Sequence, residues 1–154
     1  MSIVVRPVEI DDLPAVAELM VEMDDFYDEP DRESAESKVE SMRKFLFGTQ
    51  PSAYLLVAHD EDDPAALGMA AYSYLWPAVG SSRSLYLKEL YVRQARRRGG
   101  IGGLLMKSLF SLATEHNCSR VELTTDRTNV QAQNFYVSLG AMAADDKVFY
   151  RFRS

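Results

Sequence analysis

The segment from residue 84 to residue 125 constrains the fold of this chain more than any other. It begins with SLYLKELYV (residues 84–92), whose apolar and aromatic residues predict a strand. A glycine-rich loop follows, and residues 100–115 carry apolar side chains at helical spacing. VELTT (residues 121–125) predicts a second strand. Strands joined through one helix pair in parallel by a right-handed crossover, so this segment predicts a parallel pair.

Shorter patterns on both sides of this segment complete the predicted order of elements. The other expected strands are residues 2–7, 53–59, 65–75, 147–152 and a short one near 141–144. One expected helix follows Asp11 and Asp12, which can cap it, and others cover residues 31–47 and 129–139, the last closed by Gly140. Because residues 53–75 predict an antiparallel hairpin, the sheet is expected to be mixed.

Composition excludes several classes of protein. The 154 residues suffice for one domain with a real core, and no apolar run approaches the roughly 18 residues that cross a membrane. The net charge of -6 argues against nucleic-acid or anionic-membrane binding, because both need a broad positive surface. The single cysteine, Cys118, and the lack of a signal-peptide pattern predict a cytoplasmic protein. His59 and His116 have no partnering ligand pattern, so no metal is expected.

The stretch RQARRRGGIGGLL (residues 93–105) is strongly basic within this acidic chain. A loop that leads from a strand into a helix presents unpaired N–H groups and the positive end of the helix dipole, for which phosphate is the usual ligand. Arg97 and Arg98 can add charge-assisted contacts, although a tight turn with solvated arginines is the alternative. The Walker and dinucleotide patterns do not fit. The residues that keep side chains away from the N–H groups are Gly99, Gly100, Gly102 and Gly103.

Two motifs in this chain resemble those of one family. R-x-x-G-x-G, from Arg97 to Gly102 after the strand end LYV, resembles the pyrophosphate loop of the GNAT superfamily of acetyl-CoA-dependent N-acetyltransferases. NVQAQNFYVSLGA (residues 129–141) is similar to the family's N-x-x-A-x-x-F-Y-x-x-L-G-A helix. Less specific sequence matches elsewhere in the chain resemble the diamine or spermidine/spermine N-acetyltransferase group. One departure is Arg98, where the family often has glycine; its side chain is tolerable if it points outward.

The resemblance implies both a fold and a reaction. The fold is a single α/β (α+β) domain over residues 1–154, with a mixed, mostly antiparallel sheet of six to seven strands and about four helices. The reaction is acetyl transfer from acetyl-CoA to an amine by direct attack in a ternary complex. Backbone N–H groups around Leu90, Tyr91 and Val92 would hold the thioester and stabilise its oxyanion. The other implied cofactor-binding residues are Arg97, Arg98, Gly99, Gly100, Ile101, Gly102, Gly103, Asn129, Ala132 and Phe135.

Two side chains are candidates for proton transfer. Tyr136 stands at the position of the family's general-acid tyrosine, and its phenol is protonated at neutral pH; a ring packed against the core is the alternative. Glu89 is a candidate base or water-holder, with a surface or structural carboxylate as the alternative. Lys88 stands where the polyamine enzymes have a glutamate, which weakens the polyamine assignment. Neighbouring strand residues face opposite ways, so Glu89 inherits that place only if a bulge rotates it.

The acidic segment MDDFYDEPDRE (residues 23–33) lies where the family commonly builds its acceptor wall. The candidates to attract and stack on a cationic amine are Asp24, Asp25, Asp28 and Glu29, interleaved with Phe26 and Tyr27; a solvated helix end is the alternative. Tyr72, Tyr74 and Trp76 either line the same cleft or pack as strand aromatics. The expected acceptor is a small cationic primary amine. Alternatives are a peptide N-terminus, a protein lysine, or a non-catalytic acyl-CoA-binding domain, and a homodimer is expected from the resemblance.

Overall fold

The computed structural model describes residues 2–154, which fall into two compact units. Residues 2–123 hold the sheet and three α-helices, and residues 124–154 hold one short helix. The prediction that all 154 residues form one domain stays a prediction.

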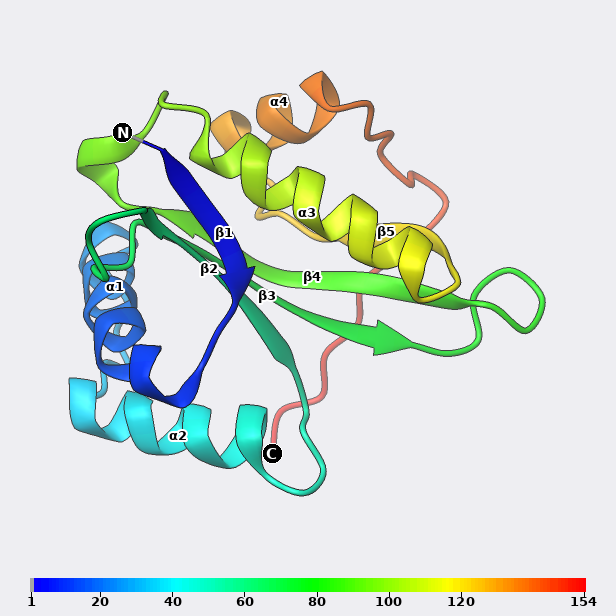
Figure 1. Cartoon of the computed structure of the whole chain (residues 1–154). Coiled ribbons are helices and arrows are strands. Elements are labelled where there is room, and N and C mark those ends of the chain that lie inside the picture. The colour runs from blue at the N-terminus through cyan, green and yellow to red at the C-terminus, as the bar shows by residue number, and fades with distance from the viewer. Residues whose placement is uncertain (1) are drawn as a thin grey trace. The chain divides into compact units, whose positions relative to one another are not determined.

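The first unit is built on five strands in the order β1-β2-β3-β4-β5 (Figure 1). The first four pair antiparallel, and β4 pairs with β5 in parallel, so the predicted hairpin, the parallel pair and the mixed sheet are all confirmed. The bounds are β1 (Ile3–Pro7), β2 (Tyr54–Asp60), β3 (Gly68–Leu75), β4 (Arg83–Val92) and β5 (Cys118–Leu123).

The expectation of six to seven strands is wrong for the described residues, since the sheet has five. Residues 141–144 and 147–152 form no strand. Val148, Phe149 and Tyr150 have the residue types of a strand, but they are 73%, 64% and 80% exposed. A strand needs a neighbour for its backbone groups and a surface for its side chains, so residue preference alone does not create one.

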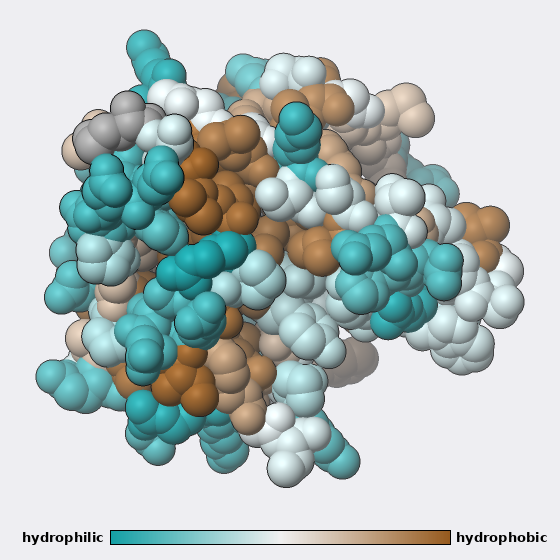
Figure 2. Space-filling view, viewed as in Figure 1, coloured by the Kyte–Doolittle hydropathy of each residue, from teal (hydrophilic) through white to brown (hydrophobic). Residues whose placement is uncertain are grey.

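Three α-helices flank this sheet: α1 (Leu13–Phe26), α2 (Ala35–Phe47) and α3 (Ile101–Glu115). Asp12 stands at the start of α1, but its side chain makes no cap bond; it accepts from both Nη atoms of Arg6 at 2.7 and 2.8 Å. Helix α2 begins at residue 35 rather than 31, because the side chain of Ser34 accepts from the Ser37 N–H at 3.1 Å. Figure 2 shows apolar side chains among the charged ones over α2.

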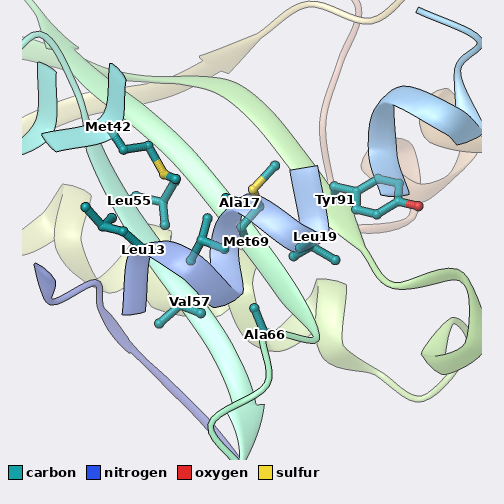
Figure 3. Packing of buried hydrophobic residues seen from close by; sticks show 10 residues of the cluster. Leu13, Ala17, Leu19, Met42, Leu55, Val57, Ala66, Met69 and Tyr91 are labelled. Carbon is teal, nitrogen blue, oxygen red and sulfur yellow. The ribbon is translucent and has the colours of Figure 1, made fainter. Parts of the chain in front are cut away.

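The two faces of the sheet are covered by different helices. Met69 of β3 and Tyr91 of β4 belong to a buried cluster with residues of α1 and α2 (Figure 3). Gly68, one residue before Met69, faces the other way: a Cβ there would lie 3.0 Å from Ile101 and 3.1 Å from Leu105 of α3. Because strand side chains alternate, α1 and α2 cover one face and α3 the other.

The second unit contains α4 (Val130–Ser138). The side chain of Asn129 accepts from the Ala132 N–H at 3.1 Å and so caps the first turn. Gly140 has φ +101°, the left-handed conformation that the sequence predicted for the residue after this helix. In the part of the chain that the structure describes, no helix combines the length and the apolar character that a membrane span requires.

Candidate cofactor and acceptor site

The free edge of β4 supplies the first element of the site. Pairing between β4 and β5 ends at Leu87 opposite Leu123, whereas β4 continues to Val92. The Arg93 N–H donates to the carbonyl of Leu67, beside β3, at 2.7 Å. Backbone groups of successive strand residues point to opposite edges, so Leu90 and Val92 direct their N–H groups away from β3. These two donors lie on the stretch where the sequence predicted an oxyanion contact.

The glycine loop that follows supplies the second element. A short 3-10 turn (Gln94–Arg96, labelled η2) leads to Gly100, which has φ +83°, and α3 begins at Ile101. The first four N–H groups of a helix have no acceptor within it, and they carry the positive end of the dipole. A Cβ placed at Gly100 or Gly103 would meet nothing within 4 Å, so the glycines leave this helix end open. The helix end therefore has the properties of an anion site.

Arg98, which departs from the family pattern, has an unfavourable backbone conformation. Arg98 has φ +66°, in the left-handed region, where a residue with a Cβ costs roughly 1–2 kcal/mol. This conformation gives a physical reason for the glycine that the family often has at this position. The Arg98 residue is exposed, as the sequence argument required.

The neighbouring arginines are held by the protein itself, which the sequence did not predict. Arg96 binds both carboxylate oxygens of Asp60 at 2.9 and 3.2 Å, and this bond lowers the pKa of Asp60. Arg97 donates from Nε to the carbonyl of Val92 at 3.1 Å. Its guanidinium carbon also lies 4.2 Å from the ring centre of Phe26 and 5.1 Å from that of Tyr91. Arg96 and Arg97 therefore fix the loop to the first unit.

A bulge in β4 decides where Glu89 lies. Ala71 pairs with Glu89, but the next residue of β3, Tyr72, pairs with Leu87, so Lys88 is the extra residue. Glu89 thus lies on the same face as its partner Ala71, which is the face covered by α1 and α2. The bulge that was the condition for the Glu89 prediction is therefore present. Glu89 is half-buried and Lys88 is exposed.

The acidic segment after α1 forms ion pairs of its own. Arg32 donates to Asp25 at 2.6 Å and to Asp28 at 3.1 Å, and its Nε donates to the carbonyl of Glu29 at 2.8 Å. A carboxylate oxygen of Glu29 accepts from the Asp31 N–H at 3.2 Å. Asp24 pairs with Lys38 at 2.7 Å, so three of the four predicted carboxylates are partly neutralised, which the sequence did not predict.

Aromatic side chains divide between the two faces of the sheet. The rings of Phe26, Tyr27 and Tyr91 contact one another, with centres 5.0 to 6.3 Å apart, on the face of α1. Met69 of β3 faces α1, and Tyr72 and Tyr74 lie three and five residues later. Because strand side chains alternate, both tyrosines face α3, where the centre of the Tyr74 ring is 5.4 Å from that of His116. The alternative that they pack as strand aromatics, rather than line the acceptor wall, fits this position.

The remaining predicted site residues lie on α4 in the second unit. Asn129 and Ala132 form the cap described above, and the rings of Phe135 and Tyr136 are 5.2 Å apart. Both aromatic residues are half-buried. The roles predicted for these four residues stay predictions.

The mixed sheet, and the strand edge that leads into a glycine-capped helix, are the features that the sequence motifs predicted for an acetyltransferase. The chain belongs to the acetyltransferase (GNAT) family, whose model matches residues 16–141. The predicted family membership and α/β fold are therefore confirmed.

Several curated relatives carry the names of N-acetyltransferases. A thialysine N-epsilon-acetyltransferase of Bos taurus is 29% identical over 108 residues, which are 66% of this chain and 63% of the relative. The spermidine/spermine N(1)-acetyltransferase-like protein 1 of Homo sapiens is 31% identical over 101 residues, 62% of this chain and 14% of the relative. The chain thus spans less than two thirds of the length of these curated relatives.

The fold is also that of a solved structure at moderate sequence identity. An integron cassette protein from the mobile metagenome of V. cholerae is 29% identical and superimposes with a TM-score of 0.90. The match covers 100% of this chain and 94% of that protein.

One residue of the site, Glu22, was missed by the sequence argument. Its carboxylate accepts from the Tyr91 hydroxyl at 2.8 Å, from Arg93 Nη1 at 3.1 Å and from the Gln94 N–H at 3.0 Å. A signal was available, because Glu22 stands three residues after Leu19 and four before Phe26, on the side of α1 that meets the sheet. A carboxylate at such a position needs partners.

Proposed function

We propose that this chain transfers the acetyl group of acetyl-CoA to the primary amine of a small molecule. The observation that supports this most is the direct passage from the free edge of β4 to the open start of α3. One stretch of backbone thereby offers N–H groups first to a thioester carbonyl, at Leu90 and Val92, and then to a pyrophosphate, at the glycines. Membership of the acetyltransferase (GNAT) family supports the same donor.

The reaction requires a neutral amine, because an ammonium has no lone pair. The amine nitrogen attacks the thioester carbonyl carbon, so a C–N bond forms while the carbonyl oxygen takes negative charge. The N–H of Leu90 or Val92 stabilises that charge. When the C–S bond breaks, the thiolate of CoA takes a proton, and the nitrogen loses one to a base or to water.

We assign the proton of the leaving thiolate to Tyr136 and the proton of the amine to Glu89, directly or through water. The Tyr136 phenol carries an O–H group that can donate its proton to a nearby thiolate. Glu89 is supported by its position beside the bulge, on the face of the sheet shared with α1 and α2. The cofactor contacts proposed for Asn129, Ala132 and Phe135 complete the assignment.

The acceptor is proposed to be an amino-acid-like amine rather than a long polyamine. Arg32 forms ion pairs with Asp25 and Asp28. These pairs lower the net negative charge of the acidic segment, which would otherwise attract a polyamine. Lys88 adds a positive charge on β4. Tyr27 and Glu29 are the proposed contacts for an amine of low charge, and the thialysine enzyme among the relatives supports this class.

A thiol-release assay with acetyl-CoA tests the function, with amino acids, polyamines, aminoglycosides and peptides as acceptors. The highest kcat/KM is expected for an amine with one net positive charge or none. Preference for a peptide or a protein would replace the proposal with peptide or lysine acetylation. Tight CoA binding without turnover for any acceptor would replace it with a regulatory acyl-CoA-binding role.

Replacing Tyr136 with phenylalanine tests the general acid. Turnover in Tyr136→Phe is expected to fall by about 100-fold or more, since positioned proton donors contribute that much. CoA affinity and the melting temperature should stay near those of the wild type, because the ring is kept. Turnover near the wild-type rate in the folded variant would remove Tyr136 from the mechanism.

A further inference from the structure

Glu22 of α1 is a carboxylate with three hydrogen-bond donors beside the candidate site. Its two oxygens accept three hydrogen bonds, from the Tyr91 hydroxyl, Arg93 Nη1 and the Gln94 N–H. The three donors come from a run of four consecutive residues, and one of them is backbone. An ion pair between two flexible surface side chains has no such arrangement.

The surroundings of Glu22 make these bonds specific. The side chains of Glu22 and Arg93 are each 29% exposed, and Tyr91 is 1% exposed. A carboxylate that is largely removed from water must be paired, and Arg93 balances its charge. Arg93 is fixed in turn, because its Nη2 donates to the carbonyl of Ala66 at 3.0 Å.

The Tyr91 hydroxyl is a permanent donor in this arrangement. Burial, together with the hydrogen bond to Glu22, raises the pKa of Tyr91 to about 12. Tyr91 lies at the edge of the buried cluster, with its hydroxyl directed away from the apolar side chains (Figure 3). The tyrosine thus connects the apolar core to a charged anchor.

The anchored residues flank the proposed catalytic donors. Val92 lies between Tyr91 and Arg93, whose side chains both end on Glu22. Gln94, which starts the turn into the glycine loop, is held by its own N–H. A movement of the Glu22 carboxylate would therefore move both ends of the backbone that carries the Val92 N–H.

We infer that Glu22 is a positioning residue, which sets the free edge of β4 and the start of the glycine loop for acetyl-CoA. It touches neither the donor nor the acceptor, and it acts through Tyr91, Arg93 and Gln94. The inference rests on the proposed function for its kinetic consequence, whereas the anchoring of the backbone is independent of it.

The test compares Glu22→Gln with Glu18→Gln, a matched change one turn earlier at an exposed position of α1. The glutamine keeps the size of the side chain but presents one acceptor oxygen in place of two. Amide resonances of Val92 and Gln94 are recorded without ligand, CoA affinity is measured by calorimetry, and kcat and KM are measured for acetyl-CoA. In Glu22→Gln, both amides are expected to shift, and the Kd for CoA should rise about tenfold. Glu18→Gln should match the wild type.

Each outcome separates two readings. A lower melting temperature with unchanged Val92 and Gln94 amides, Kd and kcat would leave Glu22 a purely structural residue and overturn the inference. If Glu22→Gln does not fold, Tyr91→Phe removes one of the three donors and should cause a smaller rise in Kd, of about threefold; no rise would also overturn it. If the wild type binds no CoA, the proposed function fails, and the amide shifts alone decide whether Glu22 holds the backbone.

Discussion

The basic loop (residues 93–100) and the acidic segment (residues 23–33) both look like ligand sites in the sequence, and in the structure the charges of both are paired within the protein. In the loop, Arg93 and Arg96 pair with carboxylates of the protein. In the acidic segment, Arg32 pairs with Asp25 and Asp28. In both regions, side-chain charges that suggested an external ligand form ion pairs within the protein.

The difference lies in what remains after this pairing. The end of the loop keeps its open glycine side and the N–H groups at the start of α3, because ion pairs between side chains do not use them. The acidic segment offered only side chains, so its pairing with Arg32 reduces what it presents to a ligand. A glycine pattern at a helix start is therefore stronger evidence for a binding site than a cluster of like charges.

The largest effect on CoA affinity is expected when a side chain closes the open side of the loop. In Gly100→Val, a branched side chain would stand at φ +83° beside the helix start, and the Kd for CoA should rise by more than about 30-fold. Gly80→Val is the control, because Gly80 also has a positive φ, +61°, and equal open space, but lies in the hairpin between β3 and β4. By calorimetry, the two variants should lose equal amounts of stability, whereas the CoA affinity of Gly80→Val should equal that of the wild type. Equal CoA affinity in both variants would show that the loop does not hold the cofactor.

A smaller effect is expected from releasing the acidic segment. Arg32→Gln frees Asp25 and Asp28, so KM for a polyamine acceptor should fall by about threefold, the size typical of exposed ion pairs. Arg43→Gln is the control, because it breaks an exposed pair with Glu40 on α2. Steady-state kinetics with a polyamine and with a neutral amine measure the difference. An unchanged KM for both acceptors would place the acceptor wall elsewhere.

The smallest effect on binding is expected at Arg98. Glycine adopts a φ of +66° without strain, so Arg98→Gly should raise the free energy of unfolding by about 1 kcal/mol. If the glycines and the helix start provide most of the affinity for CoA, the Kd should change by less than about threefold. Denaturant unfolding and calorimetry measure the two quantities. A tenfold loss of affinity would instead assign the anion contact to the arginine side chain.

Local patterns predicted the elements that carry the site. The glycine loop, the helix after it and the αL position at Gly140 follow from the conformational freedom of glycine, which acts within a few residues. The ion pairs were not predictable in this way, because Asp60 and Arg96 are 36 residues apart and Glu22 and Arg93 are 71 apart. Their contact depends on how the elements pack.

The errors have a common physical origin. Residues 147–152 have strand-like composition, but pairing depends on a neighbour that sequence alone does not supply. The strand β5 begins at Cys118 rather than at residue 121, because the polar residues Ser119 and Arg120 belong to an edge strand with exposed side chains. The bulge at Lys88 was named as a condition for Glu89, but only the register of β3 against β4 reveals it.

The single extra residue, Lys88, shifts the alternation of side chains along β4 by one position. Before it, Leu85 and Leu87 face α3; after it, Leu90 and Val92 do, while Glu89 and Tyr91 take the opposite face. The half of the strand that builds the core and the half that builds the site are therefore out of phase. A variant that deletes residue 88 would restore a regular strand, and every position that follows would keep its present face and its partner on β3. A designer who transplants this site onto a regular strand would therefore leave residue 88 out, so that the residues on both sides of it keep their faces.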